Sequence, residues 1–287
     1  MSTVPPSPTP SLADLRQEID RIDEAMHRLL MARGEIIDRL IAVKQTQESG
    51  SAFRPAREAE MMRRLVERHA GILPLDTAES IWRVIIATFT YVQAPYSVHA
   101  DLSAGEAAMR DSARFHFGFT VPFVAHMGAA AAVAAVAASK GDLALVPATL
   151  VSGGPWWAAL EPDGGPKIIA RLPFVERADH PAALPVFVVS RAAPNTLVTE
   201  VEVVSVRVSG WSAAAAQALS PLAEVVAVPD RALDGAALLI SLPSGCERTQ
   251  VNAVLVKAGT SVRSMALVGS HATRYMVGPS GVSPIGR

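Results

Sequence analysis

Residues 12–44 read LADLRQEIDRIDEAMHRLLMARGEIIDRLIAVK, and this stretch decides the fold of the first third of the chain. Its apolar residues recur at alternating steps of three and four, which is typical of a helix with one continuous packing face. We call this face the seam, and its apolar positions are Leu12, Leu15, Ile19, Ile22, Met26, Leu29, Ile36, Leu40 and Val43. Arg33 is the one polar residue at a seam position. Ser11 and Asp14 form a capping-box pair at the start, and we expect the helix to end near Gln47.

A helix of this length is too long to pack within one small domain. From Leu12 to about Gln47 it extends ~55 Å at ~1.5 Å per residue. A domain of about 100 residues has a radius of gyration near ~13 Å. Short helices of the same chain therefore cannot cover the whole seam. The sequence predicts that it pairs with a second copy of the chain, in an intertwined homodimer.

Two shorter helices are expected after the long one. The first begins near Pro55 and ends at Gly71, because proline favours the first turn and glycine favours the stop. The second begins at Asp76, with Glu79 completing a capping box, and ends at Pro95. Residues 1–10 are rich in Pro, Ser and Thr and are predicted to be a disordered tail. We therefore expect residues 11–96 to form an all-helical domain.

A second part of α/β type follows a connector at about residues 96–110, so the chain is predicted to be multidomain. Residues 143–147, 167–170 and 185–190 have the pattern of short strands, and residues 111–198 are assigned to an α/β region. Residues 199–280 then read strand (201–208), helix (212–220), strand (224–228), strand (236–242), helix (249–258) and strand (263–277). This βαββαβ order predicts a ferredoxin-like module.

Composition excludes several classes of function. The 26 basic and 27 acidic side chains give a net charge of -1. This balance provides no electrostatic footprint for nucleic acid or for a membrane surface, so we expect neither as a partner. The sequence lacks an apolar stretch of the ~20 residues that span a bilayer and lacks a secretory start, which predicts a cytoplasmic protein. One cysteine and seven scattered histidines predict no disulfide framework and no metal site.

Arg33 and Lys44 are the two cations that the helical pattern singles out. A guanidinium within an apolar seam needs a partner, because an unpaired buried charge is costly. Lys44 lies eleven residues further on, which returns it to within about 20° of the same face and places the two Cα atoms ~16 Å apart. Their side chains are thus placed to hold the ends of one small anion. Pairing of Arg33 with a protein carboxylate, with Lys44 solvated, is an equally good interpretation of these two residues alone.

The motifs around these cations resemble the all-helical chorismate mutases. The matching positions in the long helix are Leu15-Arg16, Ile22-Asp23, Leu29 to Arg33, and Lys44. PAREAEMMRRL at residues 55–65 is similar to the second helix of that family, and IWRVIIATFTYVQ at residues 81–93 to its closing segment. The resemblance covers about residues 11–95, a third of the chain. Arg16 lies ~25 Å from Arg33 along the helix; taken alone, it is an ordinary solvated residue.

The resemblance implies an enzyme of the shikimate pathway that rearranges chorismate to prephenate, on the route to phenylalanine and tyrosine. This pericyclic isomerisation uses no cofactor, metal or covalent intermediate; it needs a folded substrate and stabilisation of charge on the ether oxygen. In the implied site Arg33 holds one carboxylate, and Arg16 of the partner subunit holds the other. Lys44 donates to a carboxylate and to the ether oxygen, and Gln93 donates to that oxygen from the opposite side. Glu58 accepts a hydrogen bond from the ring hydroxyl.

Three residues keep other interpretations open. Arg57 supports the second helix's end of the implied site, but it is equally well explained as one of several basic residues on a solvated face. Arg54 stands where many family members carry an acid, which weakens recognition of the hydroxyl. Phe89 stands where a small polar residue is common, which narrows the pocket. Arg54 in particular leaves a non-catalytic ligand-binding regulator as the alternative.

The later part of the chain resembles a prephenate dehydratase domain with its regulatory module. The resemblance rests on GDLALVPATLVSGG at residues 141–154, followed by a strand and RLPFV. A bifunctional mutase–dehydratase is therefore a further alternative. However, the family's Pro-x-Glu-Asn-Ser reads PATLV at residues 147–151, and its Thr-Arg-Phe reads PVF at residues 185–187. Because hydrophobic residues replace those polar groups, we predict a catalytically inactive remnant.

Overall fold

The computed structural model describes residues 10–44, 53–149, 154–182, 184–191, 198, 200–228, 235–279 and 281–285. The chain divides into two compact units, Met1–Ser49 and Gly50–Arg287. Residues 1–9 of the predicted tail and the predicted helix end near Gln47 lie outside the described residues. Within the described ranges, no helix is both long enough and apolar enough to cross a membrane.

The first unit contains the long helix α1, Leu12–Lys44, which confirms the helix predicted from the seam. The predicted capping pair is also confirmed. The Ser11 amide donates to Asp14 Oδ2 at 2.9 Å, and the Asp14 amide donates to Ser11 Oγ at 3.2 Å. These two hydrogen bonds satisfy amide groups that have no partner within the first turn of a helix.

The two shorter helices, α2 (Pro55–Arg68) and α3 (Leu75–Gln93), belong to the second unit. The predicted capping box at Asp76 and Glu79 is wrong. Pro74 precedes α3 without a capping side chain, and the buried Glu79 carboxylate instead accepts hydrogen bonds from the amides of Phe174 and Val175, both at 2.8 Å. Burial raises the pKa of Glu79 to about 7. This carboxylate therefore ties α3 to a segment almost 100 residues later.

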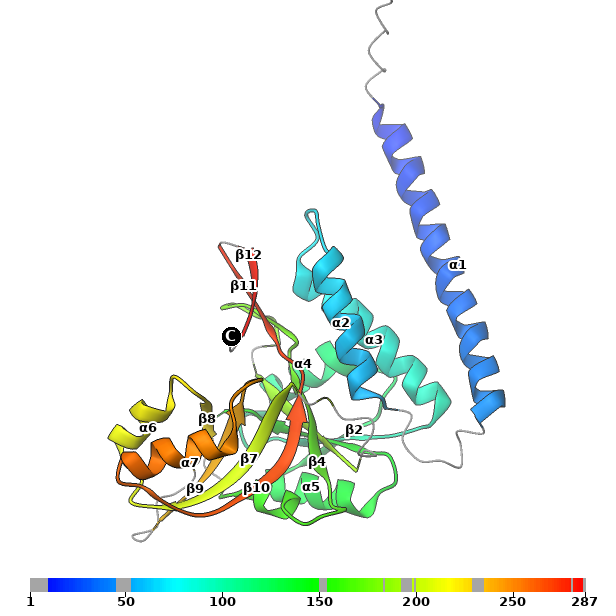
Figure 1. The fold of residues 1–287 in the computed structure, drawn as a ribbon. Coiled ribbons are helices and arrows are strands. Elements are labelled where there is room, and N and C mark those ends of the chain that lie inside the picture. Colours follow the sequence, from blue (N-terminus) through cyan, green and yellow to red (C-terminus); the bar gives the residue numbers. More distant parts are fainter. Residues whose placement is uncertain are drawn as a thin grey trace, which may run out of the picture. The chain divides into compact units, whose positions relative to one another are not determined.

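A nine-stranded sheet forms the centre of the second unit, in the order β2-β1-β3-β6-β4-β10-β7-β9-β8 (Figure 1). Its strands are β1 (Val98–Asp101), β2 (Phe123–His126), β3 (Leu143–Pro147), β4 (Lys167–Leu172), β6 (Val186–Ser190), β7 (Val201–Ser209), β8 (Glu224–Ala227), β9 (Ala236–Leu242) and β10 (Ser261–His271). A smaller sheet of order β12-β11-β5 contains β5 (Val175–Glu176), β11 (Tyr275–Gly278) and β12 (Gly281–Pro284). The helices that connect the strands are α4 (Glu106–Phe117), α5 (Ala129–Ala138), η1 (Trp156–Leu160), α6 (Ala213–Leu219) and α7 (Arg248–Lys257).

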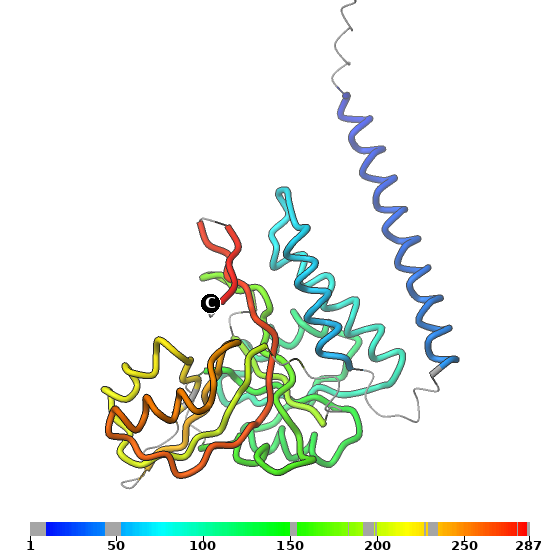
Figure 2. Tube along the Cα trace, in the orientation of Figure 1, coloured from blue at the N-terminus to red at the C-terminus, as the bar shows by residue number. Residues whose placement is uncertain are grey.

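Most of the strands predicted from β-branched runs are confirmed, including those at residues 143–147, 167–170 and 185–190. The single strand predicted over residues 263–277 is wrong: β10 ends at His271, and β11 begins at Tyr275. The chain changes partners there, because the Tyr275 amide donates to the Phe174 carbonyl at 2.8 Å and β11 pairs with β5. Figure 2 shows the trace passing from β10 into the β11–β12 hairpin, drawn in red.

Both faces of the sheet are covered, which the alternation along β6 illustrates. Phe187 and Val189 share a core cluster with α5 and η1, whereas Val186 and Val188 share another with α3 and α4. Successive residues of a strand point to opposite faces, so this strand is hydrophobic throughout. The same pattern explains why a continuous apolar run, rather than an alternating one, marks this region of the sequence.

The segment from β7 to β10 has the order β7-α6-β8-β9-α7-β10, and its strands lie antiparallel in the order β10-β7-β9-β8. α6 and α7 pack together on one face of these strands (Figure 1). β10 joins this segment to β4 through the pair Gly269 and Ile168. Gly269 has a φ of +146°, and a Cβ at this position would overlap the Ile168 carbonyl oxygen. Glycine therefore allows the two halves of the sheet to meet.

Candidate active site

The first unit, whose described residues are 10–44, does not itself cover the seam of α1. Leu29 is 71% exposed and Val43 83%, and all the seam residues from Leu12 to Met26 are at least 45% exposed. An amphipathic helix normally packs such an apolar stripe against other protein, and soluble proteins rarely leave an apolar patch of this length exposed to water. The described helix thus has an apolar packing face that its own unit leaves uncovered.

Three of the predicted site residues lie on α1. Arg16 is exposed in the second turn, Arg33 is half-buried within the seam, and Lys44 is the last residue of the helix. The regular helix keeps the Cα atoms of Arg33 and Lys44 ~16 Å apart and those of Arg16 and Arg33 ~25 Å apart. Along one helix, Lys44 therefore lies closer to Arg33 than Arg16 does.

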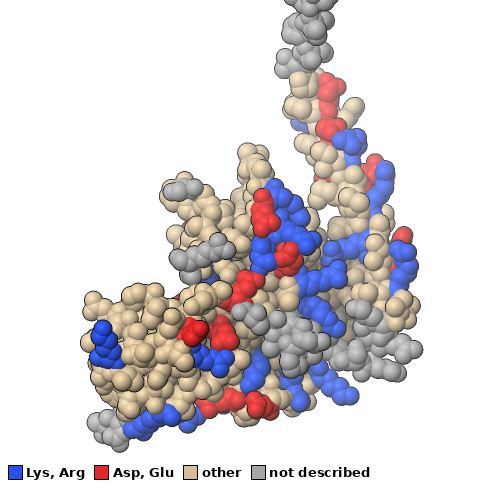
Figure 3. Space-filling view, in the orientation of Figure 1, with Lys and Arg blue, Asp and Glu red and all other residues tan. Residues whose placement is uncertain are grey.

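Arg57 lies on the exposed side of α2. Basic side chains gather over this helix, with acidic ones between them (Figure 3). Neighbouring Arg63 and Arg64 both form ion pairs with Glu60. In this unit Arg57 is therefore part of a charged, solvated face.

Glu58, the next residue, is buried between α2 and α3. Its Oε2 accepts a hydrogen bond from Arg83 Nη1 at 2.6 Å, and the two side chains are 9% and 4% exposed. Burial raises the pKa of the Glu58 carboxyl, and the Arg83 guanidinium opposes this rise. The space beside the pair has a volume of only ≈ 30 Å³, enough for about one water molecule. Within this unit Glu58 thus contacts an arginine rather than an open cavity.

Arg83 was not among the residues predicted from the sequence, although its position carries a signal. Arg83 is the only charged residue in IWRVIIATFTYVQ, the apolar segment at residues 81–93. A lone charge within an apolar helix predicts a buried partner. Its guanidinium also lies over the Phe117 ring, 5.6 Å from the centroid, so Arg83 connects α2, α3 and α4.

Breaking the Glu58–Arg83 pair is expected to destabilise the chain strongly. Arg83→Met should lower the free energy of unfolding by ~3–5 kcal/mol, because it leaves the Glu58 carboxylate buried without a counter-charge. The double variant Glu58→Leu/Arg83→Met should recover most of this loss, since it removes both charges. Urea unfolding of the full chain measures both values. Arg64→Met, which breaks an exposed pair with Glu60, is the control and should change stability by less than about 1 kcal/mol. A double variant no more stable than Arg83→Met would contradict this account.

Gln93 is half-buried at the end of α3. Its Nε2 donates to the Phe89 carbonyl at 2.9 Å, one turn back along the same helix. Ten residues separate Gln93 from Arg83, which corresponds to ~15 Å along the axis. Arg83, the residue that pairs with Glu58, thus lies nearer the middle of α3, and Gln93 is the last residue of the helix.

The positions that the sequence compared with a dehydratase motif carry apolar side chains in the structure. Val186 and Phe187, where the dehydratase motif has Arg and Phe, are fully buried in β6. Among the described residues, no three His, Cys, Asp or Glu side chains are grouped closely enough to hold a metal ion. The groups that the sequence predicts to contact a substrate are the cations of α1 and the side-chain amide of Gln93 on α3.

Comparison with known proteins finds a family model that matches one part of the chain. A solved structure described as "GqqA- a novel type of quorum quenching acylases" is similar at a TM-score of 0.39 and 14% identity, over 61% of this chain and 94% of that one; a likeness this distant carries nothing about activity. No curated protein matches the sequence. Residues 15–94, which include all six predicted site residues, match the family model of chorismate mutase type II. The family match thus covers the helical part of the chain and less than a third of its length.

Proposed function

We propose that this protein is a chorismate mutase of aromatic amino-acid biosynthesis, which acts as a homodimer with sites built from both copies. The observation that carries the proposal is the family match over residues 15–94, a range that includes Arg16, Arg33, Lys44 and Gln93. These are hydrogen-bond donors, three of them charged, as a substrate with two carboxylates and an ether oxygen requires.

The exposed seam supports the homodimer. Burying a Leu, Ile or Met side chain contributes about 1.5–3 kcal/mol, and the seam holds nine apolar residues along 33 residues of helix. Pairing two copies of α1 removes this surface from water without any rearrangement of the helix. A second copy is also the one partner that is always present at the concentration of the chain itself.

An antiparallel pair of α1 helices also delivers Arg16. If a two-fold axis passes near Glu24 and Ala25, midway between positions 16 and 33, Arg16 of the partner subunit lies level with Arg33. The same axis creates this arrangement twice, once toward each end of the pair. Each site then has Arg33 and Lys44 from one copy and an arginine from the other, which places three cations around a ligand with two carboxylates.

These groups promote the rearrangement by position and charge. Arg33 and Arg16 of the partner subunit hold the two carboxylates and so keep the substrate folded, with its reacting carbons in contact. As the ether bond breaks, negative charge develops on its oxygen, and Lys44 and Gln93 donate to that atom. Glu58 accepts a hydrogen bond from the ring hydroxyl, so its carboxylate must contact both Arg83 and the substrate. Arg57 supports this end of the site.

A non-catalytic ligand-binding protein is the second candidate, and one observation favours it. The Glu58 carboxylate is already paired with Arg83, and the space beside the pair holds only about one water molecule. A protein that had lost the hydroxyl contact would still bind a small dianion through the cations of α1. The two candidates differ in turnover, not in the ligand that they recognise.

For the later part of the chain we propose a ferredoxin-like module at residues 199–280 and an inactive dehydratase remnant at residues 111–198. The antiparallel order β10-β7-β9-β8, with α6 and α7 on one face, supports the module. The apolar side chains at residues 185–187 support the loss of dehydratase chemistry. We propose that the helical domain comprises residues 11–96.

Turnover of chorismate by the purified full chain tests the proposal. We expect chorismate absorbance to fall with enzyme concentration and prephenate to accumulate without conversion to phenylpyruvate. Saturable binding of chorismate without loss of absorbance would establish the non-catalytic alternative and refute the mutase. Sustained formation of phenylpyruvate would refute the inactive remnant while leaving the mutase intact.

A further inference from the structure

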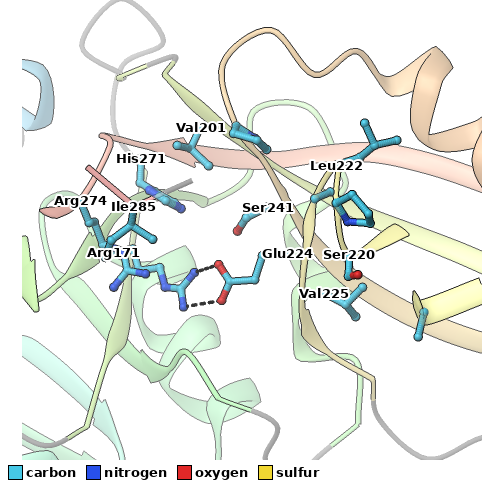
Figure 4. Close-up of a pocket in the computed structure, with 14 residues that line it drawn as sticks. Arg171, Val201, Ser220, Leu222, Glu224, Val225, Ser241, His271, Arg274 and Ile285 are labelled. Carbon is cyan, nitrogen blue, oxygen red and sulfur yellow. Dashed lines mark hydrogen bonds and ion pairs between the residues drawn. The ribbon is translucent and has the colours of Figure 1, made fainter. Parts of the chain in front are cut away.

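A pocket in the later part of the chain is lined by none of the residues of the proposed mutase site. It has a volume of ≈ 660 Å³ and is lined by residues between Arg171 and Ile285, a size that suits a small organic ligand. Figure 4 shows the Arg171 guanidinium, the Ser241 hydroxyl and the His271 ring directed into one space. These side chains come from β4, β9 and β10.

Curvature of the sheet creates this pocket. Arg171 on β4 and Glu224 on β8 are four strands apart in the sheet order, or ~19 Å at about 4.8 Å per strand. Nevertheless, Arg171 Nη1 and Nη2 donate to the two Glu224 carboxylate oxygens at 2.5 and 2.9 Å. The sheet must therefore curl toward the face that carries these side chains. Glu224 lies at the rim, with its side chain 50% exposed, whereas that of Arg171 is 6% exposed.

Three buried polar atoms in the pocket have no hydrogen-bond partner among the described residues. They are Arg171 Nε, Ser241 Oγ and His271 Nε2, and each residue is less than 10% exposed. A buried polar group without a partner costs about 1–3 kcal/mol. A ligand bound in this cavity would supply hydrogen-bond partners to all three groups, which explains why the protein does not.

Each of these atoms has a defined hydrogen-bonding role. Arg171 Nε–H donates, and the Ser241 hydroxyl donates or accepts. His271 Nδ1 contacts the Ala272 carbonyl at 2.8 Å, which places a proton on Nδ1. Burial lowers the pKa of His271 to about 3, so the ring is neutral and Nε2 is an acceptor. The pocket thus offers donors from Arg171 and Ser241 and an acceptor from His271.

The charge in the pocket favours an anion. Arg274 is a second buried arginine in its wall, and its pKa is lowered by burial and then by repulsion from Arg171. Arg171 pairs with Glu224, and Arg274 pairs with Glu176. Among the described residues that line the pocket, Glu224 is the only one with a carboxylate, and its side chain is half-exposed at the rim. The deep part of the pocket therefore has two guanidinium groups, and an anion placed there relieves their repulsion.

The remaining walls are apolar. The cavity is faced by Val201, Leu222, Val225 and Ile285. Two prolines also line it, Pro221 before β8 and Pro243 directly after β9. Ile285 is held there because its amide donates to the Arg274 carbonyl at 2.7 Å. Apolar walls with a few convergent polar groups are typical of small-molecule sites.

We propose that this pocket binds a small hydroxycarboxylic acid with an apolar body. The carboxylate accepts from Arg171 Nε and Ser241 Oγ, and the ligand hydroxyl donates to His271 Nε2. The apolar body packs against Val201, Leu222, Val225 and Ile285. This site shares no residue with the proposed mutase site, and the inference stands whether or not the chain turns over chorismate.

Calorimetric titration of the full chain with 3-phenyllactate tests this proposal. We expect saturable binding at one molecule per chain, at least tenfold tighter than the neutral probe 3-phenyllactamide and several-fold tighter than 3-phenylpropanoate, which lacks the hydroxyl. Arg33→Ala should leave this affinity unchanged, which separates the pocket from the mutase site. Absence of saturable binding by 3-phenyllactate, or equal binding of the amide, would overturn the proposal.

Three variants locate the ligand in the pocket. Ser241→Ala should weaken binding about tenfold, and because it removes a hydroxyl without a partner it leaves the fold intact. Arg171→Gln should weaken binding at least as much. Glu224→Gln should tighten binding several-fold, because it removes a negative charge that competes for Arg171. Arg207→Gln, on the same sheet but in an exposed pair with Glu161, is the control and should bind as the wild type does. Unchanged binding in Ser241→Ala, or weaker binding in Glu224→Gln, would refute the assignment.

Discussion

Arg33→Ala is expected to lower kcat/KM for chorismate at least a hundredfold. An electrostatic donor aimed at a charged substrate contributes about 3 kcal/mol or more to the transition state, which corresponds to this factor. The loss should appear in both kcat and KM, because the guanidinium both binds a carboxylate and keeps the substrate folded. Steady-state loss of chorismate absorbance measures it.

Folding and dimerisation should survive this change. Alanine at position 33 makes the seam uniformly apolar and removes a guanidinium that is half-buried in the single chain. Size-exclusion chromatography should therefore show the same assembly as the wild type. Arg28→Ala is the matched control, because Arg28 pairs with Glu24 on the exposed side of the same helix. Activity of Arg33→Ala within a few-fold of wild type would remove Arg33 from the site.

Mixing two inactive variants is expected to restore activity. Arg16→Ala and Arg33→Ala should each be nearly inactive alone, because each damages both sites of its own homodimer. In a mixed dimer, one site receives Arg33 from the first variant and Arg16 from the second and is intact, while the other site lacks both. Random exchange of equal amounts gives half mixed dimers, so about a quarter of all sites should be active.

The amount of recovered activity distinguishes the possible arrangements. Recovery to about a quarter of wild-type kcat, after unfolding and refolding of the mixed variants together, indicates that Arg16 crosses between copies. A site contained within one chain gives no recovery, since every copy in the mixture then lacks one arginine. Simple mixing without subunit exchange serves as the control and should remain inactive. A protein that is monomeric at assay concentration would contradict the homodimer directly.

Local patterns explain which elements were predictable. The seam in α1 and its Ser11–Asp14 cap depend on residues three and four apart, and the structure confirms both. Buried strands such as β3 and β6 are short apolar runs bounded by turns, and they were also predicted. The capping box at Asp76 and Glu79 failed because a carboxylate in the first turn has more than one possible partner. Only the fold brings the amides of Phe174 and Val175 to Glu79.

The break between β10 and β11 has a similar cause. Residues 263–277 have one continuous strand-like pattern. A strand in a sheet, however, extends only as far as it has a neighbouring strand to pair with. β7 begins at Val201, opposite His271, and beyond that point the chain pairs with β5 instead. The choice of partner depends on where two distant segments end, which is not encoded in either segment alone.

The sequence by itself determined the helical elements of residues 12–93 and the cations along α1, because periodicity and spacing along one helix are local properties. The tertiary structure alone decided that Glu58 is paired with Arg83, since the two meet only when α2 packs on α3. It also decided that Arg171, Ser241 and His271 surround one cavity, because strand order and sheet curvature bring together residues up to 100 positions apart. Contacts of that range arise from packing of the whole unit, and no local pattern specifies them.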